Sequence, residues 1–397
     1  MRAPNFTKDY TKGLTKILKS VKIAVLQEEE TLFHLIDVEG NERAFQEPFL
    51  LLYYAHNKTG ATLWQILFGY IPKERLIQSV QFKVQSDKRG RIYLPKIGCF
   101  KTDYPSSKLY FEYNCLTKSY QIKNQNGVVA TSLVPNLRTA NQQTTFYAFE
   151  HDYFEIAFKP YNRLNKKAHK PTNPLYQYNF GTFNRAYKLL QHTNCNYFEM
   201  LLHALTGVYN FHSDHYPSFS DRRCYGIAFL SGTRKDSVVY FLVELAQQTG
   251  HTIFNTILQN RQDYFAIDIH TPRSALTNNA DDNSHVYDAF HGLYTAVKVA
   301  ETLDYFIKKP QLFSDSENHE IKGRLLANSH RYKMGFYRMD VNRVFSAKGL
   351  LNYQKLDNYL QSLYHKHAKL LAEFPYVPDG VVFNFSKFLK QFPLKKK

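Results

Sequence analysis

Cysteine is scarce in this chain and forms no pattern. The 397 residues include four cysteines, Cys99, Cys115, Cys195 and Cys224, and no two of them form a CxxC pair. This spacing indicates neither a zinc ribbon nor a disulfide framework. We therefore expect reduced thiols, which are typical of the cytoplasm, and we take the cytoplasm as the expected location.

Long apolar runs are also absent. No stretch reaches the roughly 18–20 apolar residues that a membrane-spanning helix needs, and the N-terminal segment lacks the apolar core of a secretory signal. Tryptophan occurs once, whereas tyrosine and phenylalanine occur 30 and 31 times. The sequence predicts a protein without a membrane span, with an interior built largely from Tyr and Phe rings.

Acidic residues are outnumbered. The chain has 51 Lys and Arg against 34 Asp and Glu, which gives a net charge of +17. The excess is spread over both halves of the chain instead of forming one basic arm. Such a charge favours polyanions in general, so nucleic-acid binding stays open, with an ordinary solvated basic surface as the alternative. Binding to nucleic acid would weaken steeply with added salt, because phosphate contacts release counterions.

The first part of the chain has the pattern of short strands. After a predicted basic amphipathic helix at residues 8–27, alternating apolar and polar residues recur at short intervals between about residues 30 and 160. This spacing is typical of antiparallel strands. The predicted strands include a hairpin around Gly40, formed by residues 32–38 and 42–54, and a closing run at 144–161.

Helical spacing dominates the second part of the chain. The basic, Pro-punctuated segment 161–174 is the predicted boundary. The predicted helices beyond it cover residues 184–194, 196–211, 237–258, 284–308, 315–338 and 346–373, with strands at 225–232 and 263–269. The sequence therefore predicts an α+β protein with an N-terminal antiparallel β-rich module, residues 1–160, followed by a mainly α-helical domain, residues 175–397.

The predicted helix 237–258 carries a polar stripe. At 3.6 residues per turn, one line along it contains Glu244, Gln248, His251 and Asn255, with Gln247 beside the line. The rest of the helix is largely apolar, which is typical of a buried helix. Because buried polar groups need partners, we expect the functional site on this stripe.

The next long helix, residues 284–308, has a stripe of its own. It consists of Asp288, His291, Thr295 and Lys298, with Tyr287, Tyr294 and Glu301 alongside. Consecutive long helices commonly pack side by side, which would bring His291 close to His251. Two imidazoles and a carboxylate form a ligand set of non-haem iron and of catalytic zinc. The alternative is a pair of core histidines that are hydrogen-bonded without metal.

The two helices together resemble a known family. The run VELAQQTGHTIFN, followed about forty residues later by DAFHGLYT, is similar to the HExxH-motif proteins of bacterial peptide-modification systems, which include 2-oxoglutarate-linked HExxH-type peptide hydroxylases. The matching residues are Gly250-His251, Ile253-Phe254-Asn255 and His291-Gly292-Leu293. The resemblance covers about residues 237–303. It implies a metal-dependent hydroxylase that uses Fe(II) or zinc, with 2-oxoglutarate as a further expected cofactor.

The motif itself is altered in this chain. In the HExxH frame the chain reads QQTGH, so Gln247 stands in place of the first His and Gln248 in place of the Glu. An amide oxygen is a weak neutral ligand, and a Gln cannot act as a general base. Ordinary metalloprotease activity is therefore disfavoured. We hypothesise that Glu244 or Gln247 completes the metal site of His251 and His291.

Three further residues are assigned to the predicted site. Gln248 and Tyr294 are the candidate catalytic residues, which would orient the substrate or the metal ligands. Arg273, in the polar loop between the two helices, is expected to bind a carboxylate such as that of 2-oxoglutarate or a peptide C-terminus. A surface arginine without such a role is the alternative.

The sequence thus predicts a cytoplasmic bacterial protein that modifies peptides or natural products. In this hypothesis it is a metal-dependent oxygenase or a degenerate relative of one. Two other functions stay open. One is a non-catalytic protein that has lost its metal and binds a peptide or an acidic partner, and the other is a nucleic-acid-binding protein.

Overall fold

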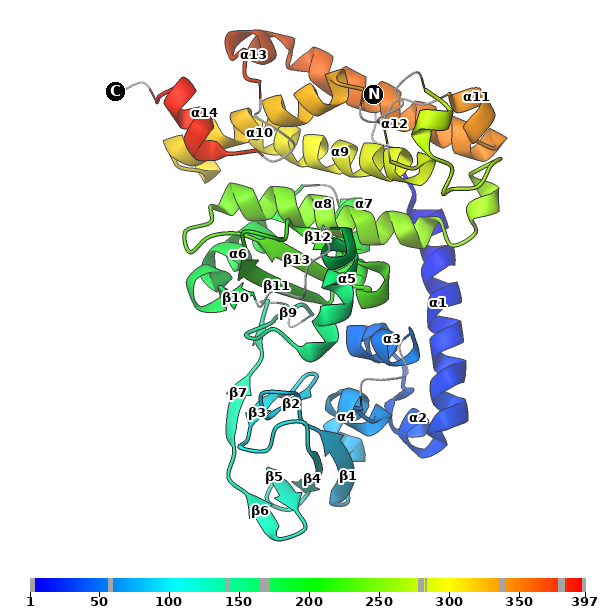
Figure 1. The fold of residues 1–397 in the computed structure, drawn as a ribbon, viewed down its shortest axis with the longest axis vertical. Helices are drawn as coiled ribbons and strands as arrows, with labels where there is room; N and C mark the ends of the chain where they lie inside the picture. Colours follow the sequence, from blue (N-terminus) through cyan, green and yellow to red (C-terminus); the bar gives the residue numbers. More distant parts are fainter. Residues whose placement is uncertain are drawn as a thin grey trace. The chain divides into compact units, whose positions relative to one another are not determined.

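The protein is a mixed α+β structure, as the sequence predicts. The computed structural model describes residues 4–55, 60–139, 141, 143–164, 172–193, 195–277, 282, 284–335, 340–377 and 383–394. It contains 55% helix and 16% strand, with an N-terminal antiparallel sheet region followed by a helical C-terminal region (Figure 1). Within the described part of the chain, no helix is both long and apolar enough to cross a membrane.

Two compact units make up the chain, and they interleave along it. The helical unit consists of Met1–Gly13, Gly181–Leu201 and Lys235–Lys397, and the sheet unit of Leu14–Phe180 and Leu202–Arg234. The predicted division into residues 1–160 and 175–397 instead follows chain order. The segment Leu202–Arg234 belongs to the sheet unit because its strand β11 (Gly207–His212) pairs in parallel with β9 (Thr145–Phe146), which lies far earlier in the sequence.

The sheet unit contains three sheets. One is antiparallel, in the order β1-β4-β5-β6. A second, also antiparallel, has the order β2-β3-β7, and the third has the order β12-β13-β11-β9-β8, with β10 paired to β11. The remaining strands are β1 (Val80–Gln85), β2 (Arg91–Leu94), β3 (Gly98–Lys101), β4 (Lys108–Asn114), β5 (Ser119–Asn124), β6 (Gly127–Val129), β7 (Ser132–Pro135), β8 (Leu137–Arg138), β10 (Asn173–Pro174), β12 (Phe219–Ser220) and β13 (Ile227–Ser231).

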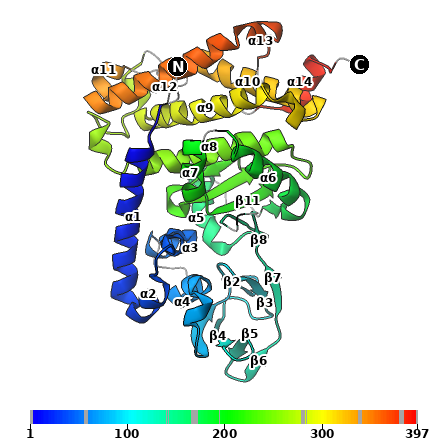
Figure 2. The same cartoon turned by 180° about the vertical axis from the view of Figure 1, so that it is seen from behind.

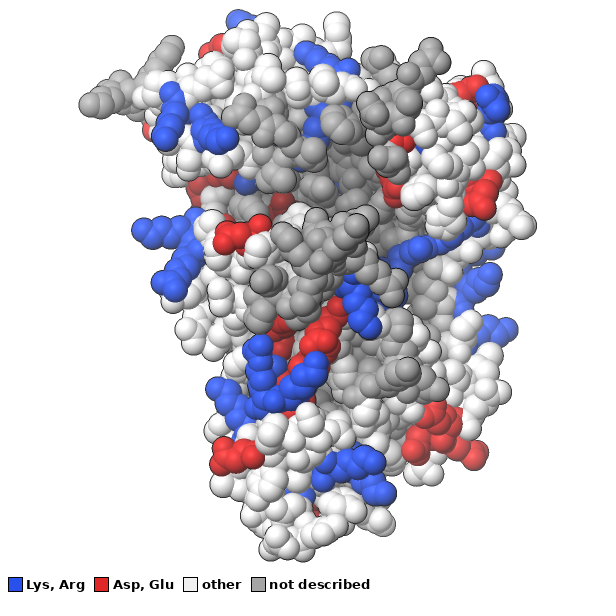
Figure 3. All heavy atoms as spheres, viewed as in Figure 1, with Lys and Arg blue, Asp and Glu red and all other residues white. Residues whose placement is uncertain are grey.

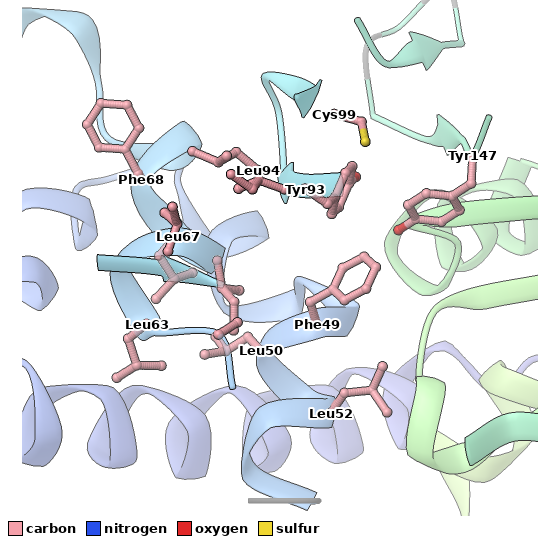
Figure 4. Close-up of a cluster of buried hydrophobic side chains, with 14 of the residues drawn as sticks. Phe49, Leu50, Leu52, Leu63, Leu67, Phe68, Tyr93, Leu94, Cys99 and Tyr147 are labelled. Atoms are coloured by element: carbon pink, nitrogen blue, oxygen red, sulfur yellow. The ribbon is translucent and has the colours of Figure 1, made fainter. Parts of the chain in front are cut away.

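Short helices of the sheet unit supply much of its core. These helices are α2 (Glu30–Ile36), α3 (Pro48–Ala55), α4 (Leu63–Leu67) and α5 (Glu155–Leu164), and α1 (Thr7–Glu28) and α6 (Tyr176–Leu190) each have residues in both units. Figure 4 shows leucine and phenylalanine side chains of α3 and α4 gathered with the rings of Tyr93 and Tyr147. Phe49 lies 5.0 Å from Tyr93 and 6.0 Å from Tyr147, measured between ring centroids. The expected aromatic interior is therefore confirmed here.

Several strands predicted from the sequence are wrong. The predicted hairpin around Gly40 is instead α2 and α3, because the buried Leu32, Phe33 and Ile36 lie on one side of a helical turn and not at alternate positions. Of residues 144–161, only Thr145–Phe146 is a strand before α5 begins, and 263–269 contains a 3-10 turn and one isolated bridge. The predicted helix at 196–211 ends at Ala204, where α7 (Cys195–Ala204) gives way to β11.

The helical unit is organised around two long helices. α9 (Val286–Ile307) lies between α8 (Val238–Ile257) on one side and α10 (Asp315–Lys333) with α12 (Ala347–Lys366) on the other (Figures 1 and 2). α8 begins after its N-cap Ser237, whose hydroxyl accepts a hydrogen bond from the Tyr240 amide at 2.9 Å. The shorter helices are α11 (Val341–Val344), α13 (Ala368–Glu373) and α14 (Phe385–Gln391).

Gly349 lies in the first turn of α12, where the chain passes very close to Tyr264. Ser346 caps this helix: its hydroxyl accepts from the Gly349 amide at 3.1 Å, and its own amide donates to the Tyr264 carbonyl at 3.1 Å. A Cβ atom on Gly349 would lie 1.8 Å from the Tyr264 carbonyl oxygen. A side chain at this position therefore requires the backbone to move.

We predict that Gly349→Ala lowers the free energy of unfolding by about 2–3 kcal/mol, because it overpacks backbone against backbone. Gly181→Ala in α6 is the matched control, since a Cβ there meets no atom within 4 Å. The control should raise the free energy of unfolding by about 0.5–1 kcal/mol. Urea unfolding of the two variants measures both effects, and equal stabilities would contradict the prediction.

Candidate functional site

The candidate site lies between α8 and α9, which run antiparallel and pack side by side. Gly250 allows the close approach, since a Cβ there would lie 3.2 Å from Thr295 Cγ2. One turn further along, the Tyr287 hydroxyl donates a hydrogen bond to Asn255 Oδ1. The two polar stripes predicted from the sequence therefore contact each other in the helical unit.

His251 and His291 meet at the centre of this contact. His251 Nδ1 lies 2.6 Å from His291 Nε2 and 3.2 Å from His291 Nδ1, and the ring centroids are 4.0 Å apart. Phe254 stacks against both His291 and Tyr294, at centroid distances of 5.8 and 4.9 Å. The two imidazoles thus converge against a wall of aromatic rings, as the helical spacing predicts.

Burial controls the charge of His251. It lowers the pKa of His251 to about 4, so this imidazole is neutral at pH 7. A neutral imidazole can accept a hydrogen bond or bind a metal ion without first losing a proton. In the contact with His291, one ring donates an N–H and the other accepts it.

Two polar groups near the pair have no partner among the described residues. The amide of Gln247, half-buried and one helical turn before His251, makes no hydrogen bond to a described residue. The hydroxyl of Tyr294, one turn after His291, is fully buried and also without a hydrogen bond. Burial raises the pKa of Tyr294, so its hydroxyl keeps its proton. These two groups are available to a bound molecule.

Glu244 and Gln248 are engaged with each other. Gln248 Nε2 donates to Glu244 Oε2 at 3.2 Å, while Gln248 Oε1 is buried without a partner. Glu244 lies two helical turns before His251, about 10 Å along the axis. Among the described residues there is no group of three or more His, Cys, Asp or Glu that could hold a metal ion. Glu244 therefore does not join the two histidines in such a group, contrary to our hypothesis.

The donor set fits a metal ion in part. An ion bound tetrahedrally at about 2.0–2.1 Å places two nitrogen ligands about 3.3 Å apart, and the two Nδ1 atoms are 3.2 Å apart. The 2.6 Å contact between His251 Nδ1 and His291 Nε2 is instead that of a direct hydrogen bond. Gln247 is the remaining candidate third ligand, because it lies on the same face of α8 one turn from His251.

Arg273 is buried, so the surface alternative is wrong for this residue. Its Nη1 lies 3.0 Å from Asp282 Oδ2, and its Nη2 donates to the Gly335 carbonyl at 3.2 Å. Although burial disfavours the charged carboxylate, hydrogen bonds from Ser284 and the charge of Arg273 hold the pKa of Asp282 below its ordinary value. The arginine thus binds a carboxylate, as expected from its chemistry, but one from its own loop.

Sequence patterns did not identify Tyr197 as part of this region. Lys298, one turn beyond Tyr294, is buried; its ammonium lies 3.1 Å from Glu301 Oε2 and 4.8 Å from the Tyr197 ring centroid. The Tyr197 hydroxyl donates to the Ala246 carbonyl of α8 at 2.8 Å. Tyr197 comes from a distant part of the chain, and only the packing of α7 on α8 reveals its place.

Comparisons with known proteins add no family to this picture. No protein-family model matches the chain, and neither does any curated protein. The resemblance to HExxH-type proteins therefore stays a prediction that rests on the residues of α8 and α9.

We predict that the metal-free protein loses stability between pH 7 and pH 5 partly through His251. The unfolded residue protonates near pH 6.5 and the folded one only near pH 4, so in this interval the unfolded chain binds more protons and is favoured as the pH falls. The contribution is about 2 kcal/mol. Urea unfolding at pH 7 and pH 5 measures the effect. Between these pH values the free energy of unfolding of His251→Asn should fall by about 2 kcal/mol less than that of the wild type. An identical fall in both proteins would contradict the prediction.

Proposed function

We propose that the chain is a peptide- or natural-product-modifying protein of the HExxH type, in which His251 and His291 bind Fe(II) or zinc. The observation that supports the proposal is the convergence of the two imidazoles, with nitrogens 2.6 and 3.2 Å apart. Two half-buried histidines on adjacent helices, flanked by the free amide of Gln247 and the free hydroxyl of Tyr294, form a polar site that is ready for a ligand. We propose the cytoplasm as its location.

The roles of the residues follow from their chemistry. His251 and His291 would hold the ion as neutral imidazoles, and Gln247 would add a weak amide oxygen. The ion, when bound, would supply a Lewis acid or, as Fe(II) with 2-oxoglutarate, an oxidising centre. Tyr294 would donate a hydrogen bond to the substrate from its protonated hydroxyl. A 2-oxoglutarate carboxylate could use Arg273 only by displacing Asp282.

Gln248 is suited to a different role from the glutamate of the HExxH motif. Its side-chain NH₂ donates to Glu244, whereas a glutamate at 248 would place two carboxylates in contact. Like charges at this spacing on a helix are destabilising. We therefore assign Gln248 to holding Glu244 in place, and no proton-transfer step is assigned to it.

A second function, binding without catalysis, is favoured by one observation. The 2.6 Å contact lets the two histidines satisfy each other without an ion. In this alternative the site has lost its metal, and the protein binds a peptide or an acidic partner. Nucleic-acid binding rests on the net charge alone. On the face drawn in Figure 3, basic side chains are interspersed with acidic ones, so that face lends it no support.

We predict about one equivalent of iron or zinc per chain in protein purified without chelator, and its loss in both His251→Ala and His291→Ala. A variant that adds an imidazole to the site tests the metal site by strengthening it. Gln247→His should raise the affinity for Zn²⁺ by about tenfold or more, because imidazole is a better ligand than an amide. Elemental analysis and titration with Zn²⁺ provide the measurements.

The exposed His34, in the sheet unit, gives the control variant His34→Ala, which should leave the metal content unchanged. Metal that persists in both histidine variants would remove these residues from the site. If the wild type contains no metal and the Gln247→His variant also fails to bind Zn²⁺, the result would favour the binding protein without catalysis.

A further inference from the structure

A separate cavity lies entirely within the sheet unit. It has a volume of about 460 Å³ and is bordered by α3, by the turn between β1 and β2, and by the start of α5. Small-molecule sites in proteins typically measure about 300–1,000 Å³. The size of this cavity is therefore that of a site for a small organic molecule, and it is independent of the function proposed above.

His151 lines this cavity and is held rigidly by aromatic rings. Its ring centroid lies 4.4 Å from that of Tyr93, 5.3 Å from Phe49, 5.6 Å from Tyr147 and 5.2 Å from Phe154. The rings of Phe49, Tyr93 and Tyr147 point toward one another in Figure 4. Such packing fixes the orientation of the imidazole, so that its polar edge is already in place before a ligand arrives.

The ring nitrogens of His151 have no hydrogen-bond partner among the described residues, although the residue is only 4% exposed. Burial, together with the charge of Arg91, lowers the pKa of His151 well below its ordinary value. The ring is therefore neutral, with one N–H to donate and one lone pair to accept. Because His151 lines the cavity, this edge can exchange hydrogen bonds with a molecule bound there.

Two other polar groups around the cavity, Gln65 and Arg91, are already satisfied. Gln65 donates to the carbonyls of Gln85 and Tyr93 and accepts from the Gln85 amide. The Arg91 guanidinium donates to Asp87 at 2.6 Å and to the Glu150 carbonyl at 2.5 Å. These groups form part of the cavity wall, and the imidazole of His151 remains available to bind a ligand.

The charges around the cavity balance. Lys88 pairs with Glu155 at 2.8 Å, and Arg91 pairs with Asp87 at 2.6 Å. The charged lining residues are Lys88, Arg91 and Lys159 on the basic side and Asp87, Asp152 and Glu155 on the acidic side. A charged ligand would lose its hydration here without gaining a net counter-charge, so the lining favours an uncharged one.

We propose that this cavity binds a small, uncharged ring compound that carries a hydroxyl group, which hydrogen-bonds to the imidazole of His151. A hydroxyl both donates and accepts, so it can pair with whichever nitrogen of the neutral ring faces it. The aromatic rings of Tyr93 and Tyr153, which line the cavity, favour a flat ring beside that hydroxyl.

Phenol is the probe that tests this proposal. In the full-length protein with ¹⁵N-labelled histidine, phenol should shift the ring ¹⁵N resonances of His151 in a saturable way. His151→Phe keeps the aromatic packing and removes both nitrogens, and it should bind phenol about tenfold more weakly. Benzoate, which adds a negative charge to a ring of the same size, should also bind about tenfold more weakly than phenol.

Two further variants keep the test decisive if His151→Phe fails to fold. Ile156→Trp fills the cavity from its lining and should abolish the shift of the His151 resonances while leaving His151 in place. His34→Phe, at a solvent-exposed histidine of the same unit, should bind phenol like the wild type. Resonances of His151 that do not move at saturating phenol would overturn the proposal, because the imidazole would then be satisfied by water. Equal affinities in the wild type and Ile156→Trp would overturn it as well.

Discussion

The contact between α8 and α9 is the constraint on which the rest of the helical unit depends. Each helix is apolar over most of its surface and carries a line of polar side chains that would be costly to bury alone. Gly250 lets the two backbones approach at Thr295, and some of the polar side chains then find partners on the other helix. The pair of His251 with His291 and the pair of Tyr287 with Asn255 follow from that single packing arrangement.

The same packing arrangement bears on whether the site would bind a metal ion or remain a metal-free core. The imidazoles of His251 and His291, with nitrogens 2.6 and 3.2 Å apart, are hydrogen-bond partners of each other and, in the proposed function, two ligands of an ion. The neighbouring residues affect which of these two arrangements is favoured. Gln247 offers only a weak amide donor, and Gln248 is tied to Glu244. In the proposed function, the choice between an enzyme and a binding protein would depend on a third ligand, so Gln247 is the most informative position to change.

Sequence patterns predicted the long helices and the antiparallel sheet region correctly, whereas several other short elements were predicted wrongly. Helices such as α8, α9 and α12 extend over five or more turns, so their apolar spacing is unambiguous. Residues 32–54 contain two short α-helices with a 3-10 turn between them, which lack such repetition, and their apolar runs also fit strands. The interleaved units were equally hidden, because the parallel pairing of β9 with β11 joins strands that are more than sixty residues apart. Such long-range pairing leaves no local signal.

The sequence by itself determined that the two polar stripes exist, which histidines they carry, and that the HExxH pattern is altered to QQTGH. These properties follow from helical periodicity, which is local. Only the tertiary structure decided that Glu244 bonds to Gln248 and not to the histidines, that Arg273 holds Asp282, and that His151 lines a cavity without a partner. Glu244 and Arg273 have their partners nearby in the sequence, but which of the possible partners each side chain takes is set by packing. The cavity around His151 is formed by elements from different parts of the chain.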